Sequence, residues 1–126
     1  MALVNFLQAF FERLDTLADR VYYGDSTDPR GKIPYVVYRY TSTIDIEKLE
    51  DFIMEVDIID NGPDPLTIEG IVNAIDGDGN ITSPSGMNYY NLKNVFRCFR
   101  INRLNLPSGD ENLLRRQLRY RCRVKV

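Results

Sequence analysis

The residue types that most enzymes use for catalysis are scarce in this chain of 126 residues. Histidine is absent, which removes the commonest general base and the commonest zinc ligand. Cys98 and Cys122 are too few for a structural zinc site, and neither has a histidine to activate it as a nucleophile. The composition therefore argues against nucleophilic and zinc-dependent catalysis.

Two neighbouring carboxylates could contribute to a magnesium site. Glu55 and Asp57 lie two residues apart in a stretch that reads as a strand, so both face the same way. With further carboxylates they could hold Mg²⁺ as nucleases do. Such sites commonly pair an acid with a lysine two residues later, and none of the four lysines has an acid at that spacing. A small metal nuclease is therefore a weak interpretation.

The start of a calcium-binding loop occurs at Asp76, Asp78 and Asn80. The pattern fails at its strictest positions, where Ile81 replaces the glycine and Met87 replaces the glutamate. A turn is the better interpretation of this stretch. We expect no metal, no cofactor and no enzymatic activity.

Charge is segregated along the chain, although the net charge is only −2. Residues 1–80 carry 16 acidic and 6 basic side chains, whereas residues 81–126 carry 2 acidic and 10 basic ones. Such a chain could bind nucleic acid through its basic part, bind copies of itself, or only present solvated strand faces.

The basic part reads as one long β-hairpin, with strands at 95–106 and 113–126 joined by a turn at 107–110. The second strand alternates between apolar and polar residues, so its two faces differ. Its apolar face comprises Leu118, Tyr120, Cys122, Val124 and Val126, and its polar face comprises Gln117, Arg119, Arg121, Arg123 and Lys125. Strands usually have five or six residues, so the extra length hints at a role beyond folding.

Apolar periodicity predicts the remaining elements. The predicted helices run over 2–19 and from the N-cap Asp64 to Gly77, and the predicted strands are a short one at Tyr22 and longer ones at 35–42 and 52–60. Residues 44–51 suit a connector or a short helical turn. We expect a single α+β domain over residues 1–126, with a mostly antiparallel sheet of four to five strands and two helices packed on one face.

The two cysteines are expected to be reduced, mostly buried thiols, because no export signal is visible. If the hairpin pairs symmetrically about Asp110, Cys98 lies opposite Cys122. A slip of one residue would instead place Phe99 opposite Cys122. No segment approaches membrane-spanning length.

Several stretches of the chain resemble one known family. The stretch FIMEVDIIDNGPDPLTIEGIVNAIDG is similar to the strand, turn and helix of the tail terminator, or tail completion, proteins of long-tailed phages and prophage remnants. The stretch VFRCFRINRLNLPSGDENLLRRQLRYRCRVKV is similar to its closing hairpin, and the opening follows the same order, with FLQAFFERL, then VYYG, then PYVVY. The resemblance covers nearly the whole chain and rests on strand and helix patterns.

This resemblance implies a structural protein rather than an enzyme. Members of the family form a ring, usually a hexamer, on the last layer of the tail tube, where they end tube polymerisation and offer a surface to the head. The implied partners are other copies of the chain, the tail-tube protein and a head connector or head-closure protein, with no membrane and no specific nucleic acid. The implied location is the virion tail, assembled in the host bacterial cytoplasm. The residues expected at subunit or tube contacts are Arg119, Arg121, Arg123, Lys125, Arg97, Glu55 and Asp57.

Two other binding functions remain open. A head-closure or tail-tube subunit of the same virion neck would share these features. A nucleic-acid-binding module could use the basic face of the C-terminal hairpin to follow phosphates. The isoelectric point of about 5.1 lies well below the range usual for such modules.

Overall fold

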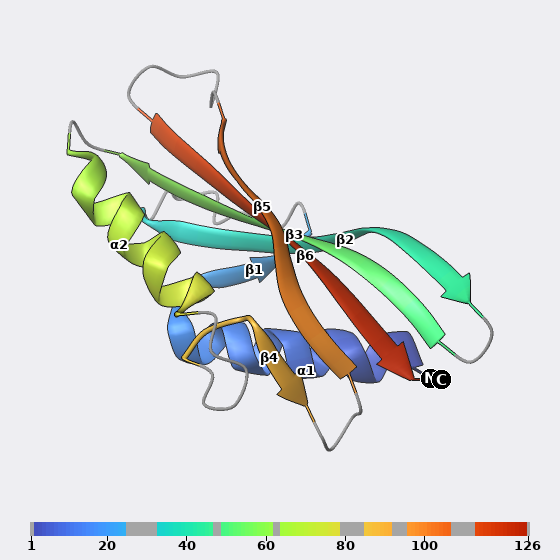
Figure 1. The fold of residues 1–126 in the computed structure, drawn as a ribbon. Helices are drawn as coiled ribbons and strands as arrows, with labels where there is room; N and C mark the ends of the chain where they lie inside the picture. Colours follow the sequence, from blue (N-terminus) through green and yellow to red (C-terminus); the bar gives the residue numbers. More distant parts are fainter. Residues whose placement is uncertain are drawn as a thin grey trace.

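The chain forms a curled six-stranded sheet with two helices (Figure 1). This computed structural model describes residues 2–24, 33–46, 49–61, 64–78, 85–91, 96–106 and 113–125. At residues 2–3, 42–46, 49–50 and 125 it describes the backbone alone. The elements are α1 (Ala2–Leu17), β1 (Val21–Tyr23), β2 (Tyr35–Ile46), β3 (Leu49–Asn61), α2 (Pro65–Asp76), β4 (Tyr89–Asn91), β5 (Phe96–Leu106) and β6 (Leu113–Lys125).

The sheet is mostly antiparallel, with the strand order β1-β2-β3-β6-β5-β4. Only the pairing of β1 with β2 is parallel within the described residues. The predicted α+β class and the antiparallel character are confirmed. The predicted count of four to five strands is too low, because β4 has three residues in a stretch without strand periodicity.

Both helices pack on one face of the sheet, here called the inner face, as predicted. α1 contributes Phe6, Phe10 and Leu14 to a single hydrophobic core, and the stripe of α2 reaches the same core. The core residues of α2 and the two central strands are Ile68, Val72, Ile75, Phe52, Met54, Val56, Ile58, Leu118, Tyr120, Cys122 and Val124. These strand residues alternate along β3 and β6, so the period of two in the sequence identified the buried face correctly.

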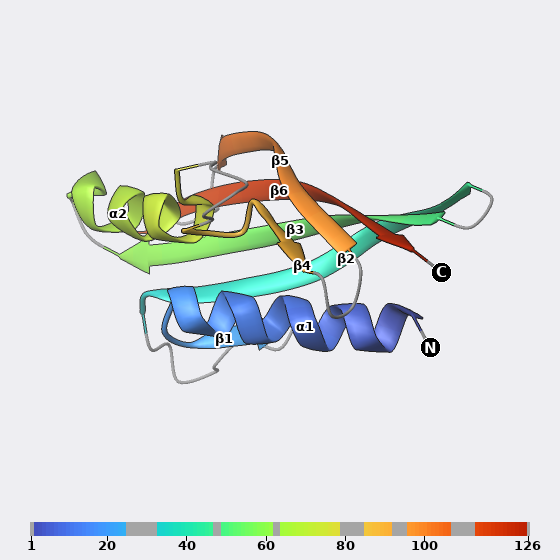
Figure 2. The ribbon, with the colours of Figure 1, turned by 60° about the horizontal axis from the view of Figure 1, so that its bottom comes forward.

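The aromatic rings of α1 fix this helix against the sheet. Phe6 stacks on Phe52 with ring centroids 4.9 Å apart, and its edge meets Phe96 at 5.1 Å. Both Phe6 and Phe52 are essentially inaccessible to solvent. Figure 2 shows α1 lying beneath β2, whereas α2 lies near the end of β3 and the start of β6.

The second helix begins and ends where its capping residues predict. Asp64 accepts a hydrogen bond from the backbone of Leu66, Pro65 occupies the first helical position, and Gly77 follows the last turn with a positive φ of 73°. The first helix ends two residues before its predicted limit, at Leu17. Within the described part of the chain, neither helix is long and apolar enough to cross a lipid bilayer.

The connector or helical turn predicted at 44–51 is wrong. β2 continues to Ile46 and β3 begins at Leu49, so the described residues 44–46 and 49–51 belong to two paired strands. The paired ends of these two strands extend past α1 in Figure 2. The acidic composition of this stretch concealed its strand character. The start of β3 is held in register by β6, because the pairing of these two strands continues to Leu49 and Lys125.

The C-terminal hairpin is confirmed as β5 and β6, while its turn at 107–110 and Val126 lie outside the described residues. Cys98 lies opposite Cys122, and the two are joined in a disulfide. The expectation of reduced thiols is therefore wrong for this structure, although both cysteines are buried as expected. A bulge between Arg100 and Asn102 then shifts the register by one residue.

Candidate functional site

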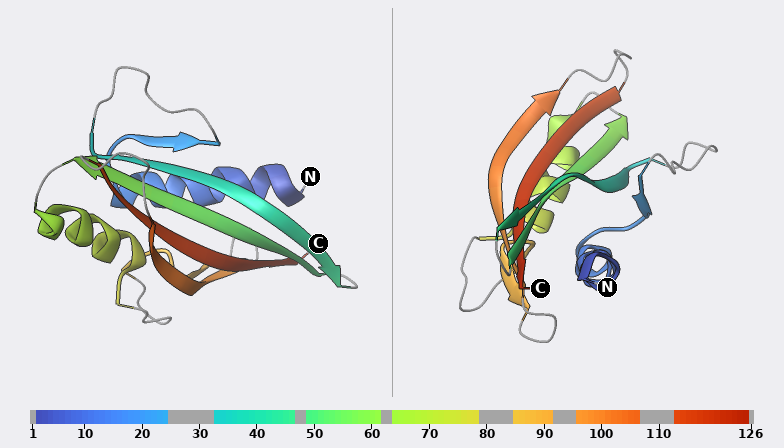
Figure 3. Two further views of the ribbon diagram at one scale, coloured as in Figure 1. Left: turned by 90° about the horizontal axis from the view of Figure 1, so that it is seen from above. Right: turned by 90° about the vertical axis from the view of Figure 1, so that its right-hand side faces the viewer.

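The sheet face opposite the helices, here called the outer face, carries the predicted interface residues. Figure 3 shows the sheet end-on, with α1 on one side of the strands. An outer charge cluster lies along β2, β3 and β6 and consists of Arg39, Asp51, Glu55, Asp57, Arg115, Gln117, Arg119, Arg121 and Arg123. The cluster forms because acidic β3 lies between Arg39 of β2 and the basic side of β6.

Asp51 is the most buried carboxylate of the outer charge cluster, with 1% of the residue exposed. Arg121 Nε donates to Asp51 Oδ2 at 2.8 Å, and Arg123 Nε donates to Asp51 Oδ1 at 3.0 Å. The hydrogen bond from Arg123 is the main cause that lowers the pKa of Asp51, and Arg121 lowers it further against the opposing effect of burial. Asp51 therefore stays ionised, and its charge is paired by two arginines of the same sheet.

Asp57 and Glu55 are also neutralised within the chain. Asp57 accepts from Arg39 at 2.6 Å, from Arg115 at 3.2 Å and from the Gln117 side chain at 2.9 Å. Glu55 lies 3.4 Å from Arg39 and accepts a 3.2 Å hydrogen bond from Gln117. Two carboxylates surrounded by guanidinium groups have little capacity left for a metal ion. Among the described residues, no group of three or more potential metal ligands comes together.

Arg119 and Arg97 are the least satisfied of the predicted basic residues. Arg119 Nε lies 3.9 Å from Glu55 Oε1 and has no hydrogen-bond partner, although this atom is buried. Asn102 is the cross-strand neighbour of Arg119, and its buried Oδ1 also lacks a partner. The guanidinium of Arg97 lies over the Phe99 ring at 5.6 Å, and no described carboxylate is within ion-pair distance of it. Arg119 Nε and Asn102 Oδ1 are therefore exceptions to the rule that buried polar atoms are hydrogen-bonded.

The structure brings together most, but not all, of the predicted site. Arg119, Arg121, Arg123, Glu55 and Asp57 share the outer face, and Arg97 joins them from β5. Lys125 pairs through its backbone with Leu49 at the end of β6, and its side chain lies outside the described part.

Four members of the outer charge cluster were not among the expected contact residues. These are Arg39, Asp51, Arg115 and Gln117. The alternation of 35–42 and of the last strand contained a signal for Arg39 and Arg115, since both are polar residues in apolar stretches. Asp51 gave no such signal, because its stretch was interpreted as a connector.

The net charge of the outer face is positive. Its described side chains include the three carboxylates of Asp51, Glu55 and Asp57. They also include six guanidinium groups, from Arg39, Arg97, Arg115, Arg119, Arg121 and Arg123. The outer face can therefore attract an acidic surface even after its internal ion pairs are formed.

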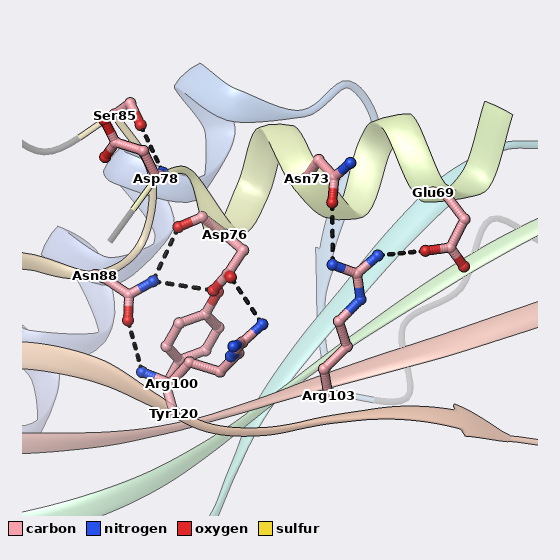
Figure 4. Close-up of polar contacts among 9 residues, drawn as sticks. All are labelled: Glu69, Asn73, Asp76, Asp78, Ser85, Asn88, Arg100, Arg103 and Tyr120. Atoms are coloured by element: carbon pink, nitrogen blue, oxygen red, sulfur yellow. Dashed lines mark hydrogen bonds and ion pairs between the residues drawn. The ribbon is translucent and has the colours of Figure 1, made fainter. Parts of the chain in front are cut away.

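A second polar cluster lies on the inner face between α2 and the C-terminal hairpin (Figure 4). Asp76 accepts hydrogen bonds from the Tyr120 hydroxyl, the Asn88 amide and Arg100, each at 2.9 Å. Glu69 pairs with both Arg103 and Arg116, which lowers its pKa chiefly through the hydrogen bond from Arg116. These contacts attach α2 to β5 and β6.

The opposite side of the molecule is acidic. Glu12, Asp15 and Asp19 are exposed on or just after α1, which packs on the inner face of the sheet. Arg20 is exposed beside them and Arg13 is partly exposed, so the α1 surface is only slightly negative.

No protein-family model matches this chain, and no curated protein is significantly similar to it in sequence.

Proposed function

We propose that this protein is a ring-forming tail terminator of a long-tailed phage or prophage remnant. It caps the tail tube, ends tube polymerisation and offers the surface at which the head joins. Its partners are further copies of the chain, the tail-tube protein and a head connector or head-closure protein. It acts by binding and not by catalysis.

The observation that carries this proposal is the outer face of the sheet. No described helix covers it, and it keeps three more positive than negative groups after pairing internally. The Arg119 side chain is 35% exposed and pairs only loosely with Glu55, so the exposed part of its guanidinium can bind a carboxylate from a partner. An acidic tube end or subunit is the partner that this chemistry fits.

The acidic α1 surface adds support for a polar assembly. A contact between the positive outer face of one copy and exposed acids on α1 of the next joins two different patches, which makes it head-to-tail. Head-to-tail contacts close into rings when the rotation between subunits is suitable. The same argument applies to a tail-tube or head-closure subunit, so the deciding test must measure tube length.

The test adds purified protein to growing tail tubes assembled from the tube subunit encoded with this chain. We expect the wild-type protein to bind the open ends and stop elongation. The variant with Arg97→Glu and Arg119→Gln should bind these ends at least tenfold more weakly, because the outer face loses positive charge. Neither arginine forms a strong ion pair within the protein, so the fold should be retained. Charge reversal at Arg121 is unsuitable, since it would place a second negative group beside buried Asp51.

A control variant, Asp15→Asn, changes one exposed charge on α1 and should leave tube capping intact if the outer face meets the tube. Duplex DNA binding measured between 50 and 200 mM salt tests the nucleic-acid alternative, because phosphate contacts weaken steeply over roughly this range. Unchanged tube growth together with salt-sensitive DNA binding would reject the terminator proposal.

A further inference from the structure

The strand β5 has a free edge along its second half. Within the described residues, β4 pairs with β5 only at Phe96, Arg97 and Cys98. The side chain of Asn88 then accepts a 2.7 Å hydrogen bond from the Arg100 amide and ends this ladder. From Ile101 to Leu106, β5 has no other described strand on that side.

The backbone of this free edge is available for pairing. The Arg100 amide points away from β6, and the single bulge residue Ile101 shifts the alternation by one position. The amide groups of Arg103 and Asn105 therefore point away from β6 and toward the free side. Such an edge is a template on which another strand can add.

A hollow of about 560 Å³ lies along the same edge. It is lined by every residue of β5 from Arg100 to Asn105, together with Glu69 of α2 and Arg116 of β6. Consecutive strand residues point to opposite faces, so only a hollow at the edge of the sheet can be lined by all of them. The lining includes three guanidinium groups and one carboxylate, and the unpartnered Asn102 lies among it.

The other end of the sheet has a matching free edge on β2. β1 pairs with β2 only at Val36, Val37 and Tyr38, and no other described strand covers β2 from Arg39 to Ile46. The Val36 amide bonds toward the β1 side, to Arg20. A bulge at Thr41 shifts the alternation by one, which directs the amides of Thr43 and Asp45 outward.

The two edges are complementary in charge. The stretch 96–106 of β5 has three basic residues and no acidic one. The stretch 43–50, at the end of β2 and the start of β3, has three acidic residues and one basic one. A basic edge with guanidinium groups around its hollow fits an acidic strand.

We infer that copies of this protein join edge to edge, with the free half of β2 in one copy adding to the free half of β5 in the next. β2 and β5 run in opposite directions within one sheet, so copies in the same orientation pair these strands antiparallel. The contact is head-to-tail, and it leaves the outer face of each sheet open for the tube. This inference rests on the proposed function, for which it supplies the contact between subunits.

The positions of the free halves also define the geometry of the ring. The free half of β2 ends at the Leu49–Lys125 end of the sheet, and the free half of β5 ends near Arg115 at the other end (Figure 1). Neighbouring sheets are therefore displaced along their strands. In closed barrels this displacement is accommodated by strands that tilt relative to the axis.

Proline substitution tests each edge, because proline removes one amide N–H and leaves the rest of the strand in place. Asn105→Pro blocks the β5 edge, and Asn105→Ala is the matched control, since both variants lose the hydrogen bond from Arg116. Thr43→Pro blocks the β2 edge, with Thr43→Val as its control. Circular dichroism and thermal unfolding verify that all four variants fold.

Sedimentation across a concentration series, with and without tube ends, then gives the assembly state. We expect rings from the wild-type protein and both controls, and monomers from each proline variant. Mixing Asn105→Pro with Thr43→Pro should give one-to-one dimers and nothing larger, because each partner retains one working edge.

The outcomes separate the two proposals. Rings of normal size from both folded proline variants would overturn the edge pairing and leave the terminator function standing. A wild-type protein that stays monomeric at every concentration and on tube ends would overturn both. If a proline variant fails to fold, Asn105→Cys and Thr43→Cys decide the question, because edge pairing predicts an intermolecular disulfide only when the two are mixed.

Discussion

The Tyr120 hydroxyl donates a hydrogen bond to Asp76 across 2.9 Å and so links the centre of the sheet to the last turn of α2 (Figure 4). Burial is the main cause that raises the pKa of Tyr120, with Asp76 raising it further, so the phenol stays protonated and acts as a donor. Asn88 and Arg100 complete the bonding of the same carboxylate. This buried network explains how an acidic residue is tolerated at a helix C-terminus.

The Tyr120–Asp76 bond should have a measurable effect on stability. Tyr120→Phe should lower the free energy of unfolding by about 2 kcal/mol, the usual contribution of a hydrogen bond to a charged group. Asp76→Ala should cost more, about 3 kcal/mol or above, because it leaves the buried Tyr120 hydroxyl and Arg100 without their acceptor. Urea unfolding at neutral pH measures both. Equal losses from the two variants would contradict this order.

Stability should fall in acid through Asp51. The pKa of Asp51 in the folded protein lies below its ordinary value of 3.8, because Arg123 and Arg121 hold the carboxylate form. The unfolded chain therefore takes up the proton first, so this contribution is complete above about pH 4 and disappears as the pH falls through the folded value. Asp51→Asn should be less stable than wild type at pH 7, with the difference shrinking toward pH 2. Parallel stability curves for the two proteins would rule out this role.

Two glycines should respond to alanine in opposite directions. A Cβ at Gly86 would lie 2.5 Å from backbone atoms of Asp76, Gly77 and Ile75, so Gly86→Ala should cost about 3 kcal/mol. A Cβ at Gly70, within α2, would meet nothing within 4 Å, so Gly70→Ala should stabilise the protein by about 1 kcal/mol. Thermal unfolding of the two variants beside wild type checks both signs. A destabilised Gly70→Ala protein would contradict the open surroundings of that position.

Reduction of the Cys98–Cys122 disulfide should weaken the protein without changing its fold. The bond closes a loop across a sequence separation of 24, for which the loop-closure model gives about 3 kcal/mol. The register should persist, because the bulge and the other β5–β6 pairs fix it independently of the disulfide. Urea unfolding with and without reductant measures the loss. The double variant Cys98→Val with Cys122→Val serves as the control, and its stability should not depend on reductant.

The sequence alone determined which face of each strand and helix is buried. Alternation identified the inner residues of β3 and β6, and helical spacing identified Phe6, Phe10 and Leu14. These patterns are readable because a period of two or of 3.6 records a local geometry that every core-facing residue repeats. The caps of α2 were equally local, since Asp64 and Gly77 act on their own helix.

Only the tertiary structure decided which strands are neighbours. In the sequence, Arg121 and Arg123 looked free to bind a partner. Because β3 lies beside β6, both donate hydrogen bonds to Asp51 instead. The start of β3 pairs with the end of β6 far along the chain, and β4 has only three residues, so neither carries a clear pattern of its own. The pairing of segments separated by about seventy residues depends on the collective packing of the sheet, and no local period encodes it.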